Sequence, residues 1–184
     1  DWYFIKPETK GIQLRFIDNL KLANYSNNIV VKTQIAADII YKHTGLKAEI
    51  ISDCLRYVSK KSISNINYPF KISWFGLDTN HDTLEFGIRE ILKYDFKVNL
   101  KIITNKLEKI RIRLGSLNLK NISLEFIEWN KEMDKEVLKT DIVIIPYLND
   151  HKRIVKSYNR IIDSISLGRF TIISDLSHLR KFKN

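Results

Sequence analysis

The sequence predicts an α/β fold: a Rossmann-like parallel sheet with helices on both faces, preceded by an incomplete N-terminal α/β lobe. The main observation is that short apolar runs alternate with segments of helical apolar spacing from Lys71 onward. Such alternation produces right-handed βαβ units and hence a parallel sheet. A second observation is the composition: of 184 residues, 44% are hydrophobic and 28% charged, a balance typical of globular proteins.

Five apolar runs are the predicted strands of this sheet. They are Lys71–Phe75, Val98–Thr104, Ile122–Trp129, Asp141–Tyr147 and Arg169–Ser174. The fourth run is apolar almost throughout, which indicates burial on both faces. Ligands of open parallel sheets bind outside the carboxyl ends of the strands, so the loops that follow these runs form the predicted binding side.

Four helices are predicted between the strands. In the first, Leu84 and Ile88 recur at helical spacing, and Asp82 with Glu85 predicts a capping box at its start. The other three are expected around Leu107–Leu114, at Lys131–Lys139 with Asn130 as N-cap, and at Ser157–Leu167, ended by Gly168.

The first 70 residues predict a separate, smaller part of the fold. A strand at Asn28–Thr33, a helix at Gln34–Thr44 ended by Gly45, and a strand at Ala48–Ser52 come first. The polar stretch Ser59–Phe70 predicts a linker. We therefore expect residues 1–66 to be the remnant of an N-terminal lobe with its linker. Residues 67–184 are expected to form a second lobe that is truncated at its C-terminus.

The overall composition narrows the classes of function. Thirty-one Lys and Arg against 21 Asp and Glu give a net charge of +10, which points to anionic partners. A single cysteine, Cys54, excludes an intramolecular disulfide framework and CxxC motifs, and a cytoplasmic location is expected. No histidine has a partner at metal-ligand spacing, so no metal site is predicted. Neither GxGxxG nor GxxxxGK[ST] is present.

The loop from Asp150 to Arg160 is the most informative segment for function. It is rich in cations and leads into the predicted fourth helix on the binding side, where free N–H groups and the helix dipole bind anions. The side chains that suit a diphosphate are Arg153, Lys156, Ser157, Asn159 and Arg160. A solvated basic loop with an ordinary serine cap is the alternative, and it stays open.

Aromatic and histidine side chains at the strand ends are further candidates. Trp129 closes the third strand on the binding side, where its ring packs either near a nucleobase or into the core. His81 follows the first strand and could hydrogen-bond a ligand.

The stretch from DIVIIPY through the basic loop to KSYNRIIDSISLGRFTIIS resembles the donor-binding half of GT-B glycosyltransferases. In that family, a strand ending in Pro precedes a helix that ends in Gly and carries an acidic residue five places earlier. Gly168 and Asp163 occupy these two positions here. KSYNR resembles the K-S-x-N-R helix start of bacterial surface-polysaccharide glycosyltransferases. The pattern extends over Asn28–Ser174 and is specific over Asp141–Ser174.

The resemblance implies a role for each donor-binding residue, while no catalytic residue is assigned. The implied roles are phosphate neutralisation by Lys156 and Arg160, hydrogen bonds to phosphate or sugar from Ser157 and Asn159, ribose binding by Asp163, and a close backbone approach to the donor at Gly76. Two features depart from the family: Val155 stands where many retaining members have Glu, and GLDTNHDTLEFG lacks the usual Arg and Lys. Arg153, Lys156 or Arg160 would replace those cations.

The resemblance therefore implies a metal-independent glycosyltransferase that moves a sugar from a nucleotide-diphosphate sugar to a glycan or lipid-linked acceptor. The nucleotide sugar is a co-substrate, and no other cofactor is expected. Peripheral contact with an anionic membrane, on the inner face of the cell membrane, is a further expectation. Two alternatives remain: a basic α/β nucleic-acid-binding domain, and a non-catalytic GT-B-like scaffold. If the chain is a glycosyltransferase, it is not expected to bind nucleic acid. The fragment alone could lack transferase activity.

Overall fold

The computed structural model describes residues 21–54 and 65–182. The chain forms two compact units. The first unit comprises Asp1–Cys54 and Asn149–Asn159, and the second comprises Leu55–Leu148 and Arg160–Asn184. The sequence did not predict that residues 149–159 group with the first unit. The predicted linker Ser59–Phe70 lies partly outside the described residues.

The first unit contains a short parallel pair of strands that are connected by one helix. β1 (Val30–Val31) pairs with β2 (Glu49–Ile50), and α2 (Gln34–Thr44) connects them. Thr33 caps this helix, because its hydroxyl oxygen accepts a hydrogen bond from a backbone N–H of the first turn. Gly45 ends it in the left-handed conformation, with φ 72°. The helix predicted here and the strands on either side of it are confirmed.

The second unit is built on a five-stranded parallel sheet of order β5-β4-β3-β6-β7. Its strands are β3 (Phe70–Phe75), β4 (Val98–Thr104), β5 (Ile122–Glu128), β6 (Ile142–Ile145) and β7 (Phe170–Ile173). All neighbouring strands are parallel. The strand order reverses between β3 and β6, and this topological switch point is where open α/β sheets bind ligands at their carboxyl ends.

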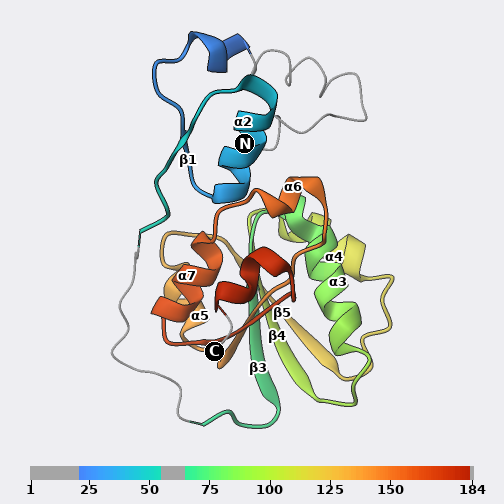
Figure 1. Ribbon diagram of the computed structural model, residues 1–184. Helices are drawn as coiled ribbons and strands as arrows, with labels where there is room; N and C mark the ends of the chain where they lie inside the picture. Colours follow the sequence, from blue (N-terminus) through green and yellow to red (C-terminus); the bar gives the residue numbers. More distant parts are fainter. Residues whose placement is uncertain (1–20, 55–64, 183–184) are drawn as a thin grey trace. The chain divides into compact units, whose positions relative to one another are not determined.

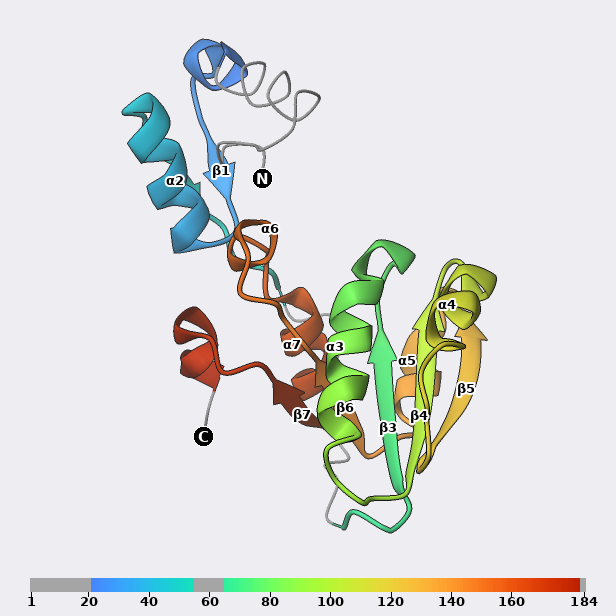
Figure 2. The same cartoon turned by 90° about the vertical axis from the view of Figure 1, so that its right-hand side faces the viewer.

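Helices cover both faces of this sheet, as the sequence predicted. Figure 1 shows α3 (His81–Ile91) and α4 (Leu107–Leu114) on one face, with α5 (Met133–Val137) and α7 (Asn159–Ser166) on the other. Turned by 90°, Figure 2 shows α3 and α4 lying in front of the sheet. The core beneath α3 and α4 is formed by apolar side chains such as Trp74, Leu84, Ile88, Leu100, Ile102 and Ile110.

The predicted starts of two helices need correction. α3 begins at His81, directly after the short helix η2 (Asp78–Asn80), and it has no side-chain cap hydrogen bond. The capping box predicted at Asp82 is therefore wrong, because η2 continues into α3 and places that residue inside the helix. α5 begins at Met133, and Asn130 caps only the preceding turn by accepting the Glu132 N–H at 2.8 Å.

Gly87 allows α3 to pack directly on the end of β6. A Cβ at this position would lie 2.5 Å from Cγ of Pro146, whose ring is rigid. We expect Gly87→Ala to lower the free energy of unfolding by about 2 kcal/mol, since overpacking outweighs the gain of about 1 kcal/mol in helix propensity. Urea unfolding measures this, with Arg89→Ala on the exposed side of α3 as control. An unchanged or more stable Gly87→Ala protein would contradict the packing described here.

Candidate functional site

The carboxyl edge of the sheet, defined as the residues that directly follow β3 to β7, gathers polar and aromatic groups in the second unit. The first residues after the five strands are Gly76, Asn105, Trp129, Pro146 and Ser174. Ser174 links two of these ends, because its hydroxyl accepts the backbone N–H of Tyr147 at 2.8 Å. These residues lie at the carboxyl ends of the parallel strands, and ligand binding at this edge stays a prediction.

Arg160 is the cation that the structure places at the switch point between β3 and β6. Its Nη1 donates a hydrogen bond to the carbonyl oxygen of Phe75 at 3.2 Å. Its guanidinium lies 5.6 Å from the centre of the Tyr147 ring, within reach of a cation–π contact. The side chain is half-buried and comes from the first turn of α7. A guanidinium held from two sides in this way is preorganised for a planar oxyanion.

Gly76 makes room for this arginine. A Cβ at Gly76 would lie 3.0 Å from the ring of Trp74 and 3.2 Å from Nη1 of Arg160. The sequence-based role for Gly76 was a close backbone approach to the donor. The structure adds a packing reason, because any side chain here would press on a fully buried indole and on the arginine.

Asp78 and Lys109 form an ion pair at the carboxyl edge that the sequence did not predict. Lys109 Nζ lies 2.8 Å from Oδ2 of Asp78, which is only 4% exposed. Asn105 accepts the backbone N–H of Asp78, also at 2.8 Å, and ties the loop after β3 to the loop after β4. The hydrogen bond from Lys109 lowers the pKa of Asp78. His81 Nδ1 lies 3.0 Å from the Asp78 carbonyl oxygen, so the ring predicted to hydrogen-bond a ligand contacts this loop.

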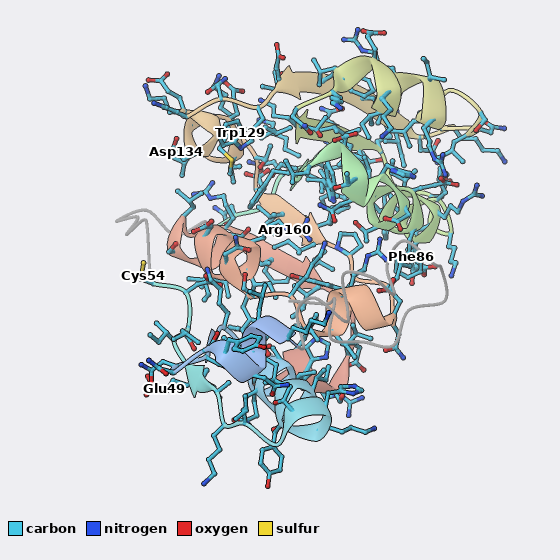
Figure 3. All side chains as sticks on the ribbon, turned by 90° about the horizontal axis from the view of Figure 1, so that it is seen from above. Glu49, Cys54, Phe86, Trp129, Asp134 and Arg160 are labelled. Atoms are coloured by element: carbon cyan, nitrogen blue, oxygen red, sulfur yellow. The ribbon has the colours of Figure 1, made fainter. Side chains whose placement is uncertain are left out.

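Trp129 and Asp163 take different positions relative to solvent. The Trp129 side chain is 51% exposed, and its indole N–H donates to Sδ of Met133 at 3.1 Å. It directly follows β5, which lies two strands away from β3, and Figure 3 shows it apart from Arg160. Asp163 lies one turn after Arg160 on α7 and is buried. The ribose role of Asp163 stays a prediction.

The remaining predicted residues belong to the first unit. Residues 151–154 form the short helix α6 (His151–Ile154) within the predicted basic loop. Arg153 is buried and pairs with the carboxylate of Asp150, which also accepts its backbone N–H at 3.0 Å. Lys156 and Ser157 are half-buried, and the Val155 carbonyl oxygen accepts the Thr33 hydroxyl at 3.3 Å. The charge of Arg153 is thus already paired within its own unit.

Metal and membrane-spanning features are absent from the described parts of the chain. Within residues 21–54 and 65–182, no three His, Cys, Asp or Glu side chains gather closely enough to hold a metal ion. In the same ranges, no helix has both the length and the apolar character needed to cross a membrane.

Comparisons with known proteins support the fold. Neither a protein-family model nor a curated protein matches the sequence. Among solved structures, the chain is similar to WaaG, a glycosyltransferase involved in lipopolysaccharide biosynthesis, with 12% identity and a TM-score of 0.63. It is also similar to a mutant of S. aureus TarM in complex with fondaparinux, alpha-GlcNAc-glycerol and UDP, with 15% identity and a TM-score of 0.60.

These similarities extend over nearly the whole of this chain but only part of the others. They cover 95% and 92% of this chain, and 52% and 34% of the WaaG and TarM chains. The chain therefore has a GT-B glycosyltransferase-like fold, as the sequence predicted, and spans about half and a third of those two proteins.

Proposed function

We propose that this chain is the donor-binding part of a glycosyltransferase that uses a nucleotide-diphosphate sugar. The observation that carries the proposal is the position of Arg160. It is held by the Phe75 carbonyl oxygen and the Tyr147 ring, at the switch point of a parallel sheet with a GT-B-like fold. Arginine matches the oxygens of a phosphate with two parallel N–H donors, which suits recognition of a diphosphate.

In this proposal, Arg160 stabilises the negative charge that develops on the departing nucleoside diphosphate. Such preorganised electrostatic stabilisation supplies on the order of 3 kcal/mol per well-placed donor. Lys156, Ser157 and Asn159 precede Arg160 in the chain, and we propose them as further donors to the phosphates or the sugar. Asp78 brings a carboxylate rather than a cation to the loop after β3, and Lys109 already neutralises it. In this proposal, the positive charge for the diphosphate therefore comes mainly from Lys156 and Arg160, just before and at the start of α7.

The other parts of the proposal concern the nucleoside, the acceptor and the location. Trp129 would pack against the nucleobase and Asp163 would bind the ribose. The reaction would be metal-independent, with the nucleotide sugar as co-substrate and a glycan or lipid-linked molecule as acceptor. A role in bacterial polysaccharide synthesis follows, at a cytoplasmic site in peripheral contact with an anionic membrane.

Isothermal titration of the chain against UDP, GDP, ADP and CMP tests the proposal. We expect saturable binding of at least one nucleoside diphosphate, and weaker binding of the monophosphate, because the second phosphate provides the charge that Arg160 recognises. Binding of none of these nucleotides would exclude the proposed site. Steeply salt-dependent binding of random single-stranded oligonucleotides, with no nucleotide binding, would favour the nucleic-acid alternative instead.

A further inference from the structure

The opposite edge of the sheet, where the strands begin, exposes two tyrosine rings that neighbouring groups hold in place. Tyr94 stacks on Phe96, with nearly parallel rings whose centres lie 5.3 Å apart. Tyr68 meets Phe70 edge-on at 5.7 Å, and its hydroxyl accepts the backbone N–H of Lys97 at 3.2 Å. Tyr68 and Tyr94 are nevertheless each 60% exposed. Rings that are both fixed and exposed offer flat apolar faces to a ligand at little cost in conformational entropy.

A small pocket beside Tyr68 combines apolar walls with polar side chains. Its volume is about 310 Å³, at the lower end of the range for small-molecule sites. It adjoins Tyr68, because the next residue, Pro69, belongs to its wall. Asn99, Lys120 and Asn121 add amide and ammonium groups to the apolar lining. A pyranose ring has the same two characters, since it presents an apolar C–H face and a rim of hydroxyl groups.

The polar side chains around this pocket are oriented by contacts with one another. The side-chain amide of Asn121 donates a hydrogen bond to the carboxylate of Asp95. The hydroxyl of Ser123 donates to the side-chain oxygen of Asn99 at 2.7 Å. An amide carries two N–H donors and a carboxylate about four acceptor positions, so both kinds of group keep hydrogen-bonding capacity for a ligand. Sugar hydroxyls both donate and accept, and they suit such a mixed set of partners.

The charges beside the rings and the pocket come close to balance. The segments 68–71, 90–99 and 119–123 carry the charged residues Lys71, Glu90, Lys93, Asp95, Lys97 and Lys120. Four cations and two anions leave a charge of +2 here, against +10 for the whole chain, and Lys93 lies 2.7 Å from Glu90 in an ion pair. A polyanion such as nucleic acid binds through many cations, whereas a glycan with few or no charges does not need them.

We propose that this surface, formed by Tyr68, Tyr94, Asn99, Lys120 and Asn121 and here named the amino-edge patch, binds a glycan. The C–H faces of sugar rings stack on Tyr68 and Tyr94, because the negative face of an aromatic ring attracts C–H groups. The hydroxyls of the same glycan form hydrogen bonds with Asn99 and Asn121. An apolar groove of about 540 Å³ lies on the α3 side of these rings and does not include Tyr68. A peptide helix in that groove would leave Tyr68 and the amides uncovered, so the mixed chemistry favours a glycan.

The amino-edge patch lies apart from the proposed nucleotide site. The seven residues of β4 separate the patch from the carboxyl edge by about 23 Å. A sugar bound to the patch is therefore not the one that would react beside Arg160, and the patch holds glycan without acting on it. The glycan site does not depend on the proposed transfer reaction, because a non-catalytic protein with this surface would use the same contacts.

Isothermal titration of the 184-residue chain with cellohexaose, maltohexaose, chitohexaose and hexagalacturonate tests the proposal. We expect saturable binding of at least one hexasaccharide, and binding that persists in about 0.5 M salt, where charge attraction is screened. Tyr94→Ala is expected to weaken this binding about 10-fold, because it removes one stacking face, while Tyr94→Phe stays within about twofold of wild type. Asn121→Ala is expected to weaken it about fivefold by removing hydrogen bonds. The matched control is Tyr41→Ala, which removes a 57% exposed tyrosine from α2.

The outcomes distinguish a glycan site from charge attraction, from self-association and from the nucleotide site. Binding of none of the four hexasaccharides, or equal losses in Tyr94→Ala and Tyr41→Ala, would overturn the proposal. So would binding of hexagalacturonate alone that disappears in salt. A dimer in sedimentation that Tyr94→Ala dissociates, without any sugar binding, would identify a second copy as the occupant instead. Nucleotide titration of Tyr94→Ala is expected to give wild-type affinity, because the ring lies at the far edge of the sheet. A lack of nucleotide binding in the wild type would overturn the proposed function without affecting the sugar result.

Discussion

Arg160→Met is expected to weaken nucleoside diphosphate binding by about 10- to 100-fold, because hydrogen bonds to charged groups contribute about 1.5–3 kcal/mol each. The side chain of Met has nearly the length of Arg but brings neither charge nor N–H donors. Arg160→Lys keeps the charge and loses the planar fork, so its affinity is expected between those of the wild type and Arg160→Met. Isothermal titration with the best-binding diphosphate measures the three proteins.

Two controls separate a binding effect from a folding effect. Arg113→Met removes a similar cation from an exposed position on α4 and is expected to leave nucleotide affinity unchanged. Urea unfolding of Arg160→Met shows how much stability the loss of the Phe75 hydrogen bond costs. Affinity within twofold of wild type in a folded Arg160→Met protein would remove Arg160 from the proposed site.

The strands and helices of the second unit could be predicted because each is encoded locally. β6 is a run of four buried apolar residues, and α4 carries Ile110 and Leu114 one turn apart on its buried side. Such patterns depend only on the alternation of burial along the chain. In a parallel sheet all strands end at the same edge. Gly76 and Arg160 could therefore both be predicted to lie at the carboxyl edge of the sheet.

The contacts that shape the site could not be predicted, because their partners are far apart in the sequence. Asp78 and Lys109 are 31 residues apart, and no local pattern selects one carboxylate for one lysine. The start of α3 was missed for a related reason, since η2 provides a turn that makes a side-chain cap unnecessary. The ring contacts of Phe96 with Phe70 and Tyr94 could not be predicted either, because Phe70 and Phe96 occur in two separate segments that meet only in the folded sheet.

The same long-range pairing gives the second strong expectation, which concerns a buried lysine in β4. Lys101 is 6% exposed, and its Nζ lies 2.7 Å from Glu136 and 3.4 Å from Glu125. Glu136→Gln leaves this cation buried with only the exposed Glu125 as counter-charge. Removing one partner of a buried pair is costly, and we expect a loss of about 2 kcal/mol in the free energy of unfolding.

Lys101→Met is expected to behave differently from Glu136→Gln, although both break the same pair. Methionine fills a similar volume without a charge, and Glu136 is partly exposed and keeps its contact with Lys139. We therefore expect stability within about 1 kcal/mol of wild type, since replacing a buried ion by an apolar side chain is often neutral. Adding Lys101→Met to Glu136→Gln should restore most of the loss. If Lys101→Met costs as much as Glu136→Gln, the pair itself is strongly stabilising and this account is wrong.

The loss of stability caused by Glu136→Gln should also depend on pH. Hydrogen bonds from Lys101 and Lys139 lower the pKa of Glu136 in the folded protein. A depressed carboxyl pKa contributes stability that is fully present above the unfolded value, near 4.3, and is lost as the pH falls through the folded value. The difference in unfolding free energy between wild type and Glu136→Gln should therefore be constant above about pH 6 and shrink below about pH 4. Glu132→Gln, which breaks an exposed pair with Lys135, should change stability by less than about 0.5 kcal/mol throughout. Urea unfolding across this pH range therefore separates the cost of leaving Lys101 unpaired from the general effect of removing a surface charge.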